Sequence, residues 1–137
     1  MPVMDSYDQN FIDFWKKKIK KSYIRMLILY SLYIEGKCTG YMITRQLKAQ
    51  LGHIFQLSAG AIYPQLQQFE ERGLVTSEIA TLATSEIRPR QPRRVYSLTQ
   101  KGYNTTRKLE KEWMELISVA NSLLEAIWHL DQEVNTA

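Results

Sequence analysis

The segment Leu57–Leu74 reads LSAGAIYPQLQQFEERGL and predicts a short helix with two different faces. Ser58 is a favoured residue at a helix N-cap, and Gly73 is typical of a helix end. One apolar stripe recurs at helical spacing along this segment and consists of Ile62, Leu66 and Phe69. The other face holds small residues and glutamines, where a solvated helix more often holds Lys and Glu. Such a helix can insert into a groove. The working hypothesis for the rest of the chain is that the groove belongs to DNA.

Composition limits the class of protein. The chain has 137 residues, enough for one domain with an appended element, and 45% of them are hydrophobic, enough for a core. Cys38 is the only cysteine, which excludes an intramolecular disulfide and fits a reducing, cytoplasmic setting. The acidic N-terminus lacks the apolar core of a signal peptide. The longest apolar run, Met26–Ile34, is under half of the ~20 residues that cross a bilayer, so no membrane partner is expected.

Charge is unevenly distributed along the chain. Between Phe14 and Lys108 there are 17 Lys and Arg against 5 Asp and Glu, a net charge of +12. Residues 1–13 contribute −3, and residues 109–137 contribute −5. A basic body between acidic ends favours a polyanionic partner, and nucleic acid is the usual one. An ordinary basic surface without such a partner is the alternative for a protein whose net charge is only +4.

Three helices are predicted ahead of residue 57. Asn10–Lys21 combines aromatic residues at helical spacing with five lysines, which either lie in solvent or contact a DNA backbone. Ser22–Glu35 is more apolar and is predicted to be the buried core helix. Thr39 predicts the N-cap of a third helix, Gly40–Leu51. That helix and the one within Leu57–Leu74, joined by a short turn, are typical of a helix-turn-helix.

Two strands and a basic hairpin are predicted next. Leu74–Ile79 and Arg94–Leu98 are rich in β-formers, and the segment Ala80–Arg93 between them contains prolines that forbid a helix. Four arginines concentrate positive charge around the tip: Arg88, Arg90, Arg93 and Arg94. Beside a helix-turn-helix, this hairpin is expected to contact DNA phosphates or the minor groove. The alternative is a solvated, mobile loop.

Thr99 predicts the N-cap of a last, long helix. Apolar residues follow at alternating spacings of four and three, and they form a heptad seam made of Leu109, Trp113, Leu116, Ala120, Leu123, Ile127 and Leu130. A body of this size does not need so long a stripe for its own core. The expected partner is the same helix of a second subunit, although packing on the chain's own N-terminal helix remains a partial alternative.

With three helices, a strand, a basic hairpin, a second strand and a long helix, the chain resembles the PadR family of transcriptional regulators. The resemblance covers about residues 24–103, and the residues that carry it are Leu29–Gly36, Gly40–Tyr41, Leu57–Leu66, Phe69–Val75 and Arg94–Gly102. The run Ser-x-Gly-x-x-Tyr-Pro-x-Leu, and its distance to Tyr-x-Leu-Thr-x-x-Gly, are much more specific than a generic helix-turn-helix. Two features depart from the family pattern: Ala61 stands where Thr is usual, and a basic residue is common near Gln67 or Gln68, whereas both are amides here.

The predicted fold class is mainly α with a small β-hairpin wing, that is, a winged helix-turn-helix plus a long C-terminal dimerisation helix. Residues 1–21 form an N-terminal amphipathic basic helix, residues 22–102 the DNA-binding domain, and residues 103–137 the dimerisation helix. The resemblance implies a homodimer, DNA binding and, usually, repression of transcription. Some family members bind aromatic or drug-like effectors at the dimer interface.

The recognition helix is expected to lie in a major groove of double-stranded DNA, with a palindromic site whose half-sites lie ~34 Å apart or a multiple of that. Gln65 or Gln68 is expected to pair with adenine, Ala61 to touch a thymine methyl, and the Tyr63 hydroxyl to reach a phosphate. The expected DNA contacts are Ser58, Ala61, Tyr63, Gln65, Gln68, Arg88, Arg90, Arg93 and Arg94. Most of the affinity for DNA phosphates is assigned to the wing and to the N-terminal lysines.

Trp113 is the candidate for an effector site, together with Phe14 and Trp15 at the same interface. Paired indoles across a two-fold axis can stack a flat ligand, whereas plain packing in the seam is the alternative. No metal cluster, cofactor motif, phosphate loop or nucleophile motif is recognisable in the sequence, so an enzyme is not expected. The rival function is a winged helix that binds another protein and does not bind DNA.

Overall fold

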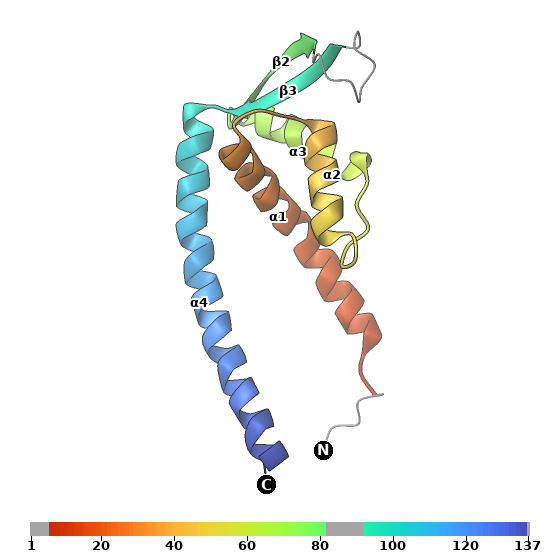
Figure 1. Ribbon diagram of the computed structural model, residues 1–137, viewed down its shortest axis with the longest axis vertical. Coiled ribbons are helices and arrows are strands. Elements are labelled where there is room, and N and C mark those ends of the chain that lie inside the picture. Colours follow the sequence, from red (N-terminus) through yellow and green to blue (C-terminus); the bar gives the residue numbers. More distant parts are fainter. Residues whose placement is uncertain (1–5, 82–91, 137) are drawn as a thin grey trace.

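The computed structural model describes residues 6–81 and 92–136. Its elements are, in order, α1 (Gln9–Glu35), β1 (Cys38–Thr39), α2 (Gly40–Leu51), α3 (Ala59–Glu71), β2 (Val75–Thr81), β3 (Pro92–Leu98) and α4 (Gln100–Thr136). Figure 1 shows α1, α2 and α3 gathered below the β2–β3 hairpin, with α4 running from the foot of the hairpin along one side. The predicted fold class, a mainly helical winged helix with a long C-terminal helix, is confirmed.

α1 corrects one prediction. The two helices expected over residues 10–21 and 22–35 are one continuous helix of 27 residues. Asp8 caps its start by accepting a hydrogen bond from the Phe11 N–H at 2.9 Å, and it ends at Gly36, where φ is 84°. No Gly or Pro interrupts the segment, so its change from basic to apolar marks where the helix enters the body, not where it ends.

The sheet has three antiparallel strands in the order β1-β3-β2. β2 and β3 form the predicted hairpin, with Val75 opposite Leu98 and Ile79 opposite Arg94. β1 was not predicted from the sequence, because two residues carry no readable alternation. It pairs Cys38 with Tyr96, which ties the end of α1 to the base of the hairpin.

The core lies where the first three helices meet the sheet. The largest fully buried side chains come two from each helix and one from β1: Ile28, Leu32, Ile43, Leu47, Ile62, Leu66 and Cys38. The predicted inner stripe of α3 is therefore confirmed. In α2 the predicted stripe is confirmed at Ile43, Leu47 and Leu51, but not at Tyr41, which is 49% exposed. Burial raises the pKa of the Cys38 thiol, and the nearby Glu35 carboxylate raises it further.

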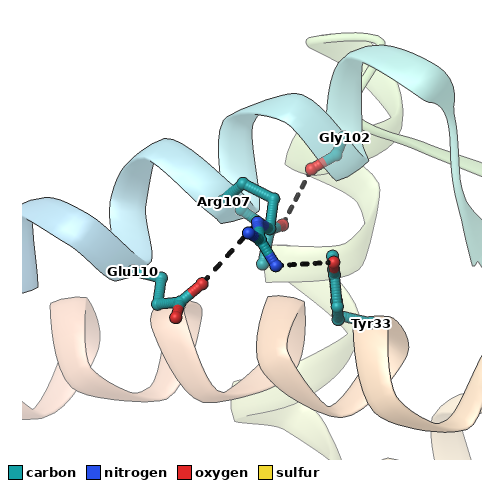
Figure 2. Close-up of polar contacts among 5 residues, drawn as sticks. Tyr33, Gly102, Arg107 and Glu110 are labelled. Atoms are coloured by element: carbon teal, nitrogen blue, oxygen red, sulfur yellow. Dashed lines mark hydrogen bonds and ion pairs between the residues drawn. The ribbon is translucent and has the colours of Figure 1, made fainter.

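α4 is held against the body by its first turns. Thr99 caps it as predicted, since its hydroxyl accepts a hydrogen bond from the Gly102 N–H at 3.0 Å. Farther along, Arg107 reaches α1: its Nη1 donates to the Tyr33 hydroxyl at 3.3 Å, and its Nε lies 3.9 Å from a Glu110 carboxylate oxygen (Figure 2). The Tyr33 and Tyr103 rings meet edge to face at 5.4 Å.

Beyond these contacts, α4 leaves the body. In Figure 1 its second half extends past α2 and α3, toward the end of the molecule where both chain termini lie. Large apolar side chains along this half are exposed, namely Leu116, Val119, Leu123, Leu124, Ile127, Trp128, Leu130 and Val134. Despite this apolar character, no helix among the described residues has the length and hydropathy needed to span a membrane.

Candidate nucleic-acid interface

α2 and α3 form the predicted helix-turn-helix. Thr39 caps α2, and its hydroxyl accepts from the Met42 N–H at 3.1 Å. Ser58 stands at the start of α3 in an extended conformation and is exposed, and its side chain makes no capping hydrogen bond. The buried stripe of α3 fixes which of its residues face outward, and these are Gly60, Tyr63, Pro64, Gln67, Gln68, Glu70 and Glu71.

Gln65 was predicted on the outward face, and this orientation is wrong. Its residue is only 9% exposed. Because each residue turns an α-helix by about 100°, position 65 lies about 40° from the direction of Phe69, on the side of the buried stripe that faces Arg25 of α1. Gln67, which was not selected from the sequence, lies nearly opposite the buried stripe and is exposed. The directions of the apolar residues alone were enough to identify it.

Arg25 of α1 explains where both amides point. Its Nε donates to Gln65 Oε1, and its Nη2 donates to Gln68 Oε1. Gln68 is exposed, as predicted, but its carbonyl oxygen is engaged by this arginine. The sequence gives no signal for this contact, because Arg25 lies forty residues ahead of Gln65 on another helix.

One edge of α3 borders the wing. Tyr63 is 42% exposed, and its ring packs so closely over Gly40 that a Cβ there would lie 2.4 Å from Tyr63 Cε1. The Arg93 guanidinium lies 5.9 Å from the centre of the exposed Tyr41 ring at the start of α2. Phenol hydroxyls and an arginine are thus brought to the same side of the helix-turn-helix, where they can meet phosphates.

Arg94 lies on the opposite face of the wing from Arg93, because successive side chains of a strand alternate between its two faces. Its Nη1 donates to the Ser77 hydroxyl at 2.9 Å, so β2 supports the side chain. Glu78 of the same hairpin pairs at 3.1 Å with Lys37, which lies just ahead of β1, and both side chains are exposed. Arg88 and Arg90 fall outside the described residues.

The opposite edge of α3 borders the lysines of α1. A groove of about 160 Å³ is lined by Lys17, Lys20 and Lys21 on one side and by Gly60, Ala61 and Gln65 on the other. Lys20 Nζ also donates to the Gln56 carbonyl at 2.6 Å, just ahead of α3. The cations therefore lie beside the N-terminal end of α3, where the helix dipole also favours anions.

The far end of α3 carries the opposite charge. Glu70 and Glu71 are exposed in its last turn and would repel phosphates. A polyanion is consequently favoured at the first two turns of the helix, between the α1 lysines and the wing. The small residues Gly60 and Ala61 lie in that stretch, and Gln67 follows in the third turn.

The predicted effector residues are not brought together. Trp113 lines two pockets, one of about 380 Å³ with Tyr30 and Arg107, and one of about 560 Å³ with Arg25 and Phe69. Its ring meets that of Tyr23 at 6.2 Å. Phe14 and Trp15 line neither of these pockets and are exposed near the start of α1. In the described part of the chain, no group of three or more His, Cys, Asp and Glu is arranged to hold a metal ion.

Comparison with known proteins adds independent information. The model of the transcriptional regulator PadR-like family matches residues 28–111. The structure of a PadR family transcription regulator from Clostridium difficile R20291 is 27% identical, with a TM-score of 0.60, over 74% of this chain and 98% of that one. A PadR family regulator from Eggerthella lenta DSM 2243 is 24% identical, with a TM-score of 0.64, over 85% and 94%.

One solved relative contains nucleic acid. Bacillus subtilis PadR in complex with operator DNA is 25% identical, with a TM-score of 0.52, over 64% of this chain and 45% of that one. None of the curated proteins compared by sequence matches this chain.

Proposed function

Because the chain belongs to the PadR-like family of transcriptional regulators, we propose that it is a cytoplasmic repressor that binds a palindromic operator as a homodimer. Members of this family are DNA-binding regulators of transcription and not enzymes. The observation that carries the rest is the position of α3. Its polar outer face lies between the α1 lysines on one side and Arg93 and Tyr41 on the other.

In the proposed complex, the first three turns of α3 enter a major groove. Gln67 is placed at the centre of the reading face, with Gln68 and Ala61 toward α1. Lys17 and Lys21 contact the backbone on one side of the groove. The Tyr63 hydroxyl, Arg93 and Arg94 contact it on the other, and Arg88 and Arg90 of the wing extend this grip. Ser58, exposed ahead of α3, adds a hydroxyl near a phosphate.

Selection of bound duplexes from random DNA tests the function directly. A regulator of the proposed kind enriches an inverted repeat whose half-sites lie about one helical turn apart or a multiple of it. Failure to enrich any motif, with retention of a protein partner from the host instead, would favour a winged helix that acts by protein binding.

Replacing Arg93 and Arg94 together by Ala is expected to weaken binding to all DNA sequences by a similar factor. Each lost phosphate contact lowers the slope of log affinity against log salt by about 0.9 in magnitude, so the slope should flatten while the preferred motif stays the same. Fluorescence anisotropy titrations at several salt concentrations measure both quantities.

The matched control replaces Lys108 and Lys111 by Ala. Replacing these exposed lysines of α4 removes the same charge outside the helix-turn-helix and the wing. If the two double variants lose affinity and slope equally, the wing arginines act only through net charge and not as local phosphate contacts.

The dimer is proposed on the exposed half of α4. Leu109 and Trp113 of the seam are half-buried against the chain's own body, whereas Leu116, Ala120, Leu123, Ile127 and Leu130 are exposed. An apolar stripe of this length on a helix that projects from the body matches a two-fold helical interface. The exposed Phe11, Phe14 and Trp15 of α1 give a second apolar patch for the same partner.

An effector site is proposed at Trp113, formed by its two pockets and not by Phe14 and Trp15. Planar aromatic compounds are expected to quench the fluorescence of Trp113 after Trp15 and Trp128 have been replaced by Phe. Binding in the larger pocket would contact Arg25 and Phe69, which touch or belong to α3. Quenching that persists in a Trp113→Leu variant retaining Trp15 and Trp128, but is absent when only Trp113 remains, would contradict this assignment.

A further inference from the structure

We propose that Arg25 sets the base preference of the recognition helix by holding the side-chain amides of Gln65 and Gln68 in one orientation, so that Gln68 reads DNA as a donor. Arg25 lies on α1, outside the helix-turn-helix, and is not itself required to touch a base. This inference rests on the proposed DNA-binding function and specifies how α3 discriminates between bases.

The chemistry of the guanidinium fixes the orientation of both amides. Arginine offers five N–H donors and no acceptor, so an amide that faces it must present its carbonyl oxygen. Arg25 meets Gln65 through Nε and Gln68 through Nη2, which uses two different donors of the fork. A flip of either amide would turn its NH₂ group toward a cation and lose the hydrogen bond.

Burial makes the first of these bonds a fixed anchor. Gln65 is 9% exposed, and the Arg25 bond satisfies its carbonyl oxygen inside the body. Arg25 itself is partly buried and lines a pocket with Phe69 of α3 and Trp113 of α4. Once this anchor places the guanidinium, its Nη2 is directed at Gln68, the exposed member of the pair.

The second bond decides what Gln68 can read. A glutamine pairs bidentately with adenine by accepting from N6 and donating to N7. With Oε1 committed to Arg25, Gln68 keeps its two N–H donors for the groove. Guanine presents two acceptors, N7 and O6, at the same edge, whereas adenine presents one acceptor and one donor. The arrangement therefore favours guanine over adenine at the base that Gln68 faces, in contrast to the adenine contact predicted from sequence.

The test compares binding motifs selected from random duplex DNA by the full-length wild type, Arg25→Met and Gln68→Ala. The wild type should prefer guanine over adenine at one position of each half-site by roughly five- to a hundredfold. Arg25→Met frees the amide to rotate, so the same position should shift toward adenine. Gln68→Ala, with or without Arg25→Met, should show no preference there.

Two further variants separate orientation from charge and from folding. Arg25→Lys keeps the charge, but one ammonium is a point donor without the fork, so the preference should weaken in the same direction as in Arg25→Met. Gln68→Glu can still pair with Arg25 but has no donor, so the guanine preference should disappear even if Arg25 variants fold poorly. Circular dichroism and sedimentation confirm that each variant keeps its helices and its assembly.

The outcomes separate this inference from the function on which it rests. Motif enrichment by the wild type with an unchanged preference in Arg25→Met and Arg25→Lys would overturn the role of Arg25 and leave the DNA-binding function intact. A shift in Arg25→Met but not in Arg25→Lys would assign the effect to charge and overturn the orienting role. No enriched motif with the wild type would remove the proposed function and this inference together.

Discussion

Replacing Leu123 and Ile127 together by Glu is expected to convert the protein into a monomer and to lower its affinity for the operator at least hundredfold. Both side chains are exposed on α4, at 64% and 54%, so the substitution removes little packing within the subunit. In a two-fold interface, both subunits contribute the same residues to the seam. Four carboxylates would then be placed in an apolar seam, where each unpaired charge costs several kcal/mol.

The loss of DNA affinity follows from the loss of the second half-site contact. When two DNA-binding domains are joined in a dimer, binding of the second domain is intramolecular. The overall affinity then exceeds that of one domain by a factor of roughly 10²–10⁴. A monomer that retains an intact α3 still binds one half-site weakly. Analytical ultracentrifugation measures the assembly, and anisotropy titrations against the full and the half operator measure the affinities.

The control for this experiment lies on the same helix. Ser118 and Ser122 are exposed and have the same spacing of four, but they fall outside the heptad seam. Ser118→Glu with Ser122→Glu adds the same charge to α4 and should leave the dimer and the affinity nearly unchanged. Equal dissociation in both double variants would indicate a general charge effect, and a Leu123→Glu, Ile127→Glu protein that remains dimeric would place the interface elsewhere.

The parts of the fold that depend on local periodicity could be predicted from the sequence. The inner stripes of α2 and α3 alternate at helical spacing, Thr39 and Thr99 are both caps, and the two hairpin strands carry β-forming residues. Each of these signals is confined to a window of about a dozen residues. For this reason the winged-helix architecture follows from the sequence almost entirely.

The features that depend on contacts between distant segments could not be predicted. The orientation of Gln65 is governed by Arg25, and β1 exists because Cys38 finds Tyr96 on β3. The break expected within α1 reflected a change in composition, which records what the helix packs against and not whether the helix continues. Gln67 could have been predicted, because the directions of Ile62, Leu66 and Phe69 follow from the sequence and identify Gln67 as an outward-facing residue.

In the candidate site, too, the local elements could be predicted from the sequence, whereas the contacts between distant segments could not. Sequence identified α3 and the arginine-rich hairpin, but it included Gln65 in the outward face of α3, whereas that side chain is buried and turned toward Arg25 of α1. The α1 lysines were treated as a separate grip, whereas Lys17, Lys20 and Lys21 share a groove with Gly60 and Ala61. Their closeness to α3 comes from the crossing of α1 and α3, a tertiary property. The structure therefore adds the position of these lysines beside the first turns of α3.

Gly102→Ala is expected to destabilise the protein by about 2–3 kcal/mol, the upper part of the range for overpacked sites. A Cβ at this buried position would lie 1.9 Å from the Leu74 carbonyl oxygen. That oxygen belongs to the backbone and accepts a hydrogen bond from the Thr99 N–H at 3.0 Å. The neighbouring Gly73 carbonyl accepts from the Thr99 hydroxyl at 2.6 Å, so neither segment can move without breaking the cap of α4.

The spacing of Thr99 and Gly102 thus has a physical reason: the threonine caps α4 and the glycine lets its first turn lie against the start of β2. Gly60→Ala is the matched control, because the nearest atom to a Cβ there is Ser58 Oγ at 3.6 Å and alanine favours a helix by up to about 1 kcal/mol over glycine. Thermal unfolding should therefore show a fall in Tm of roughly 5–10 °C for Gly102→Ala and no fall for Gly60→Ala. Equal melting temperatures for the two variants would mean that α4 can shift away from Leu74 at little cost. The close packing of its first turn would then not determine the direction in which α4 leaves the body.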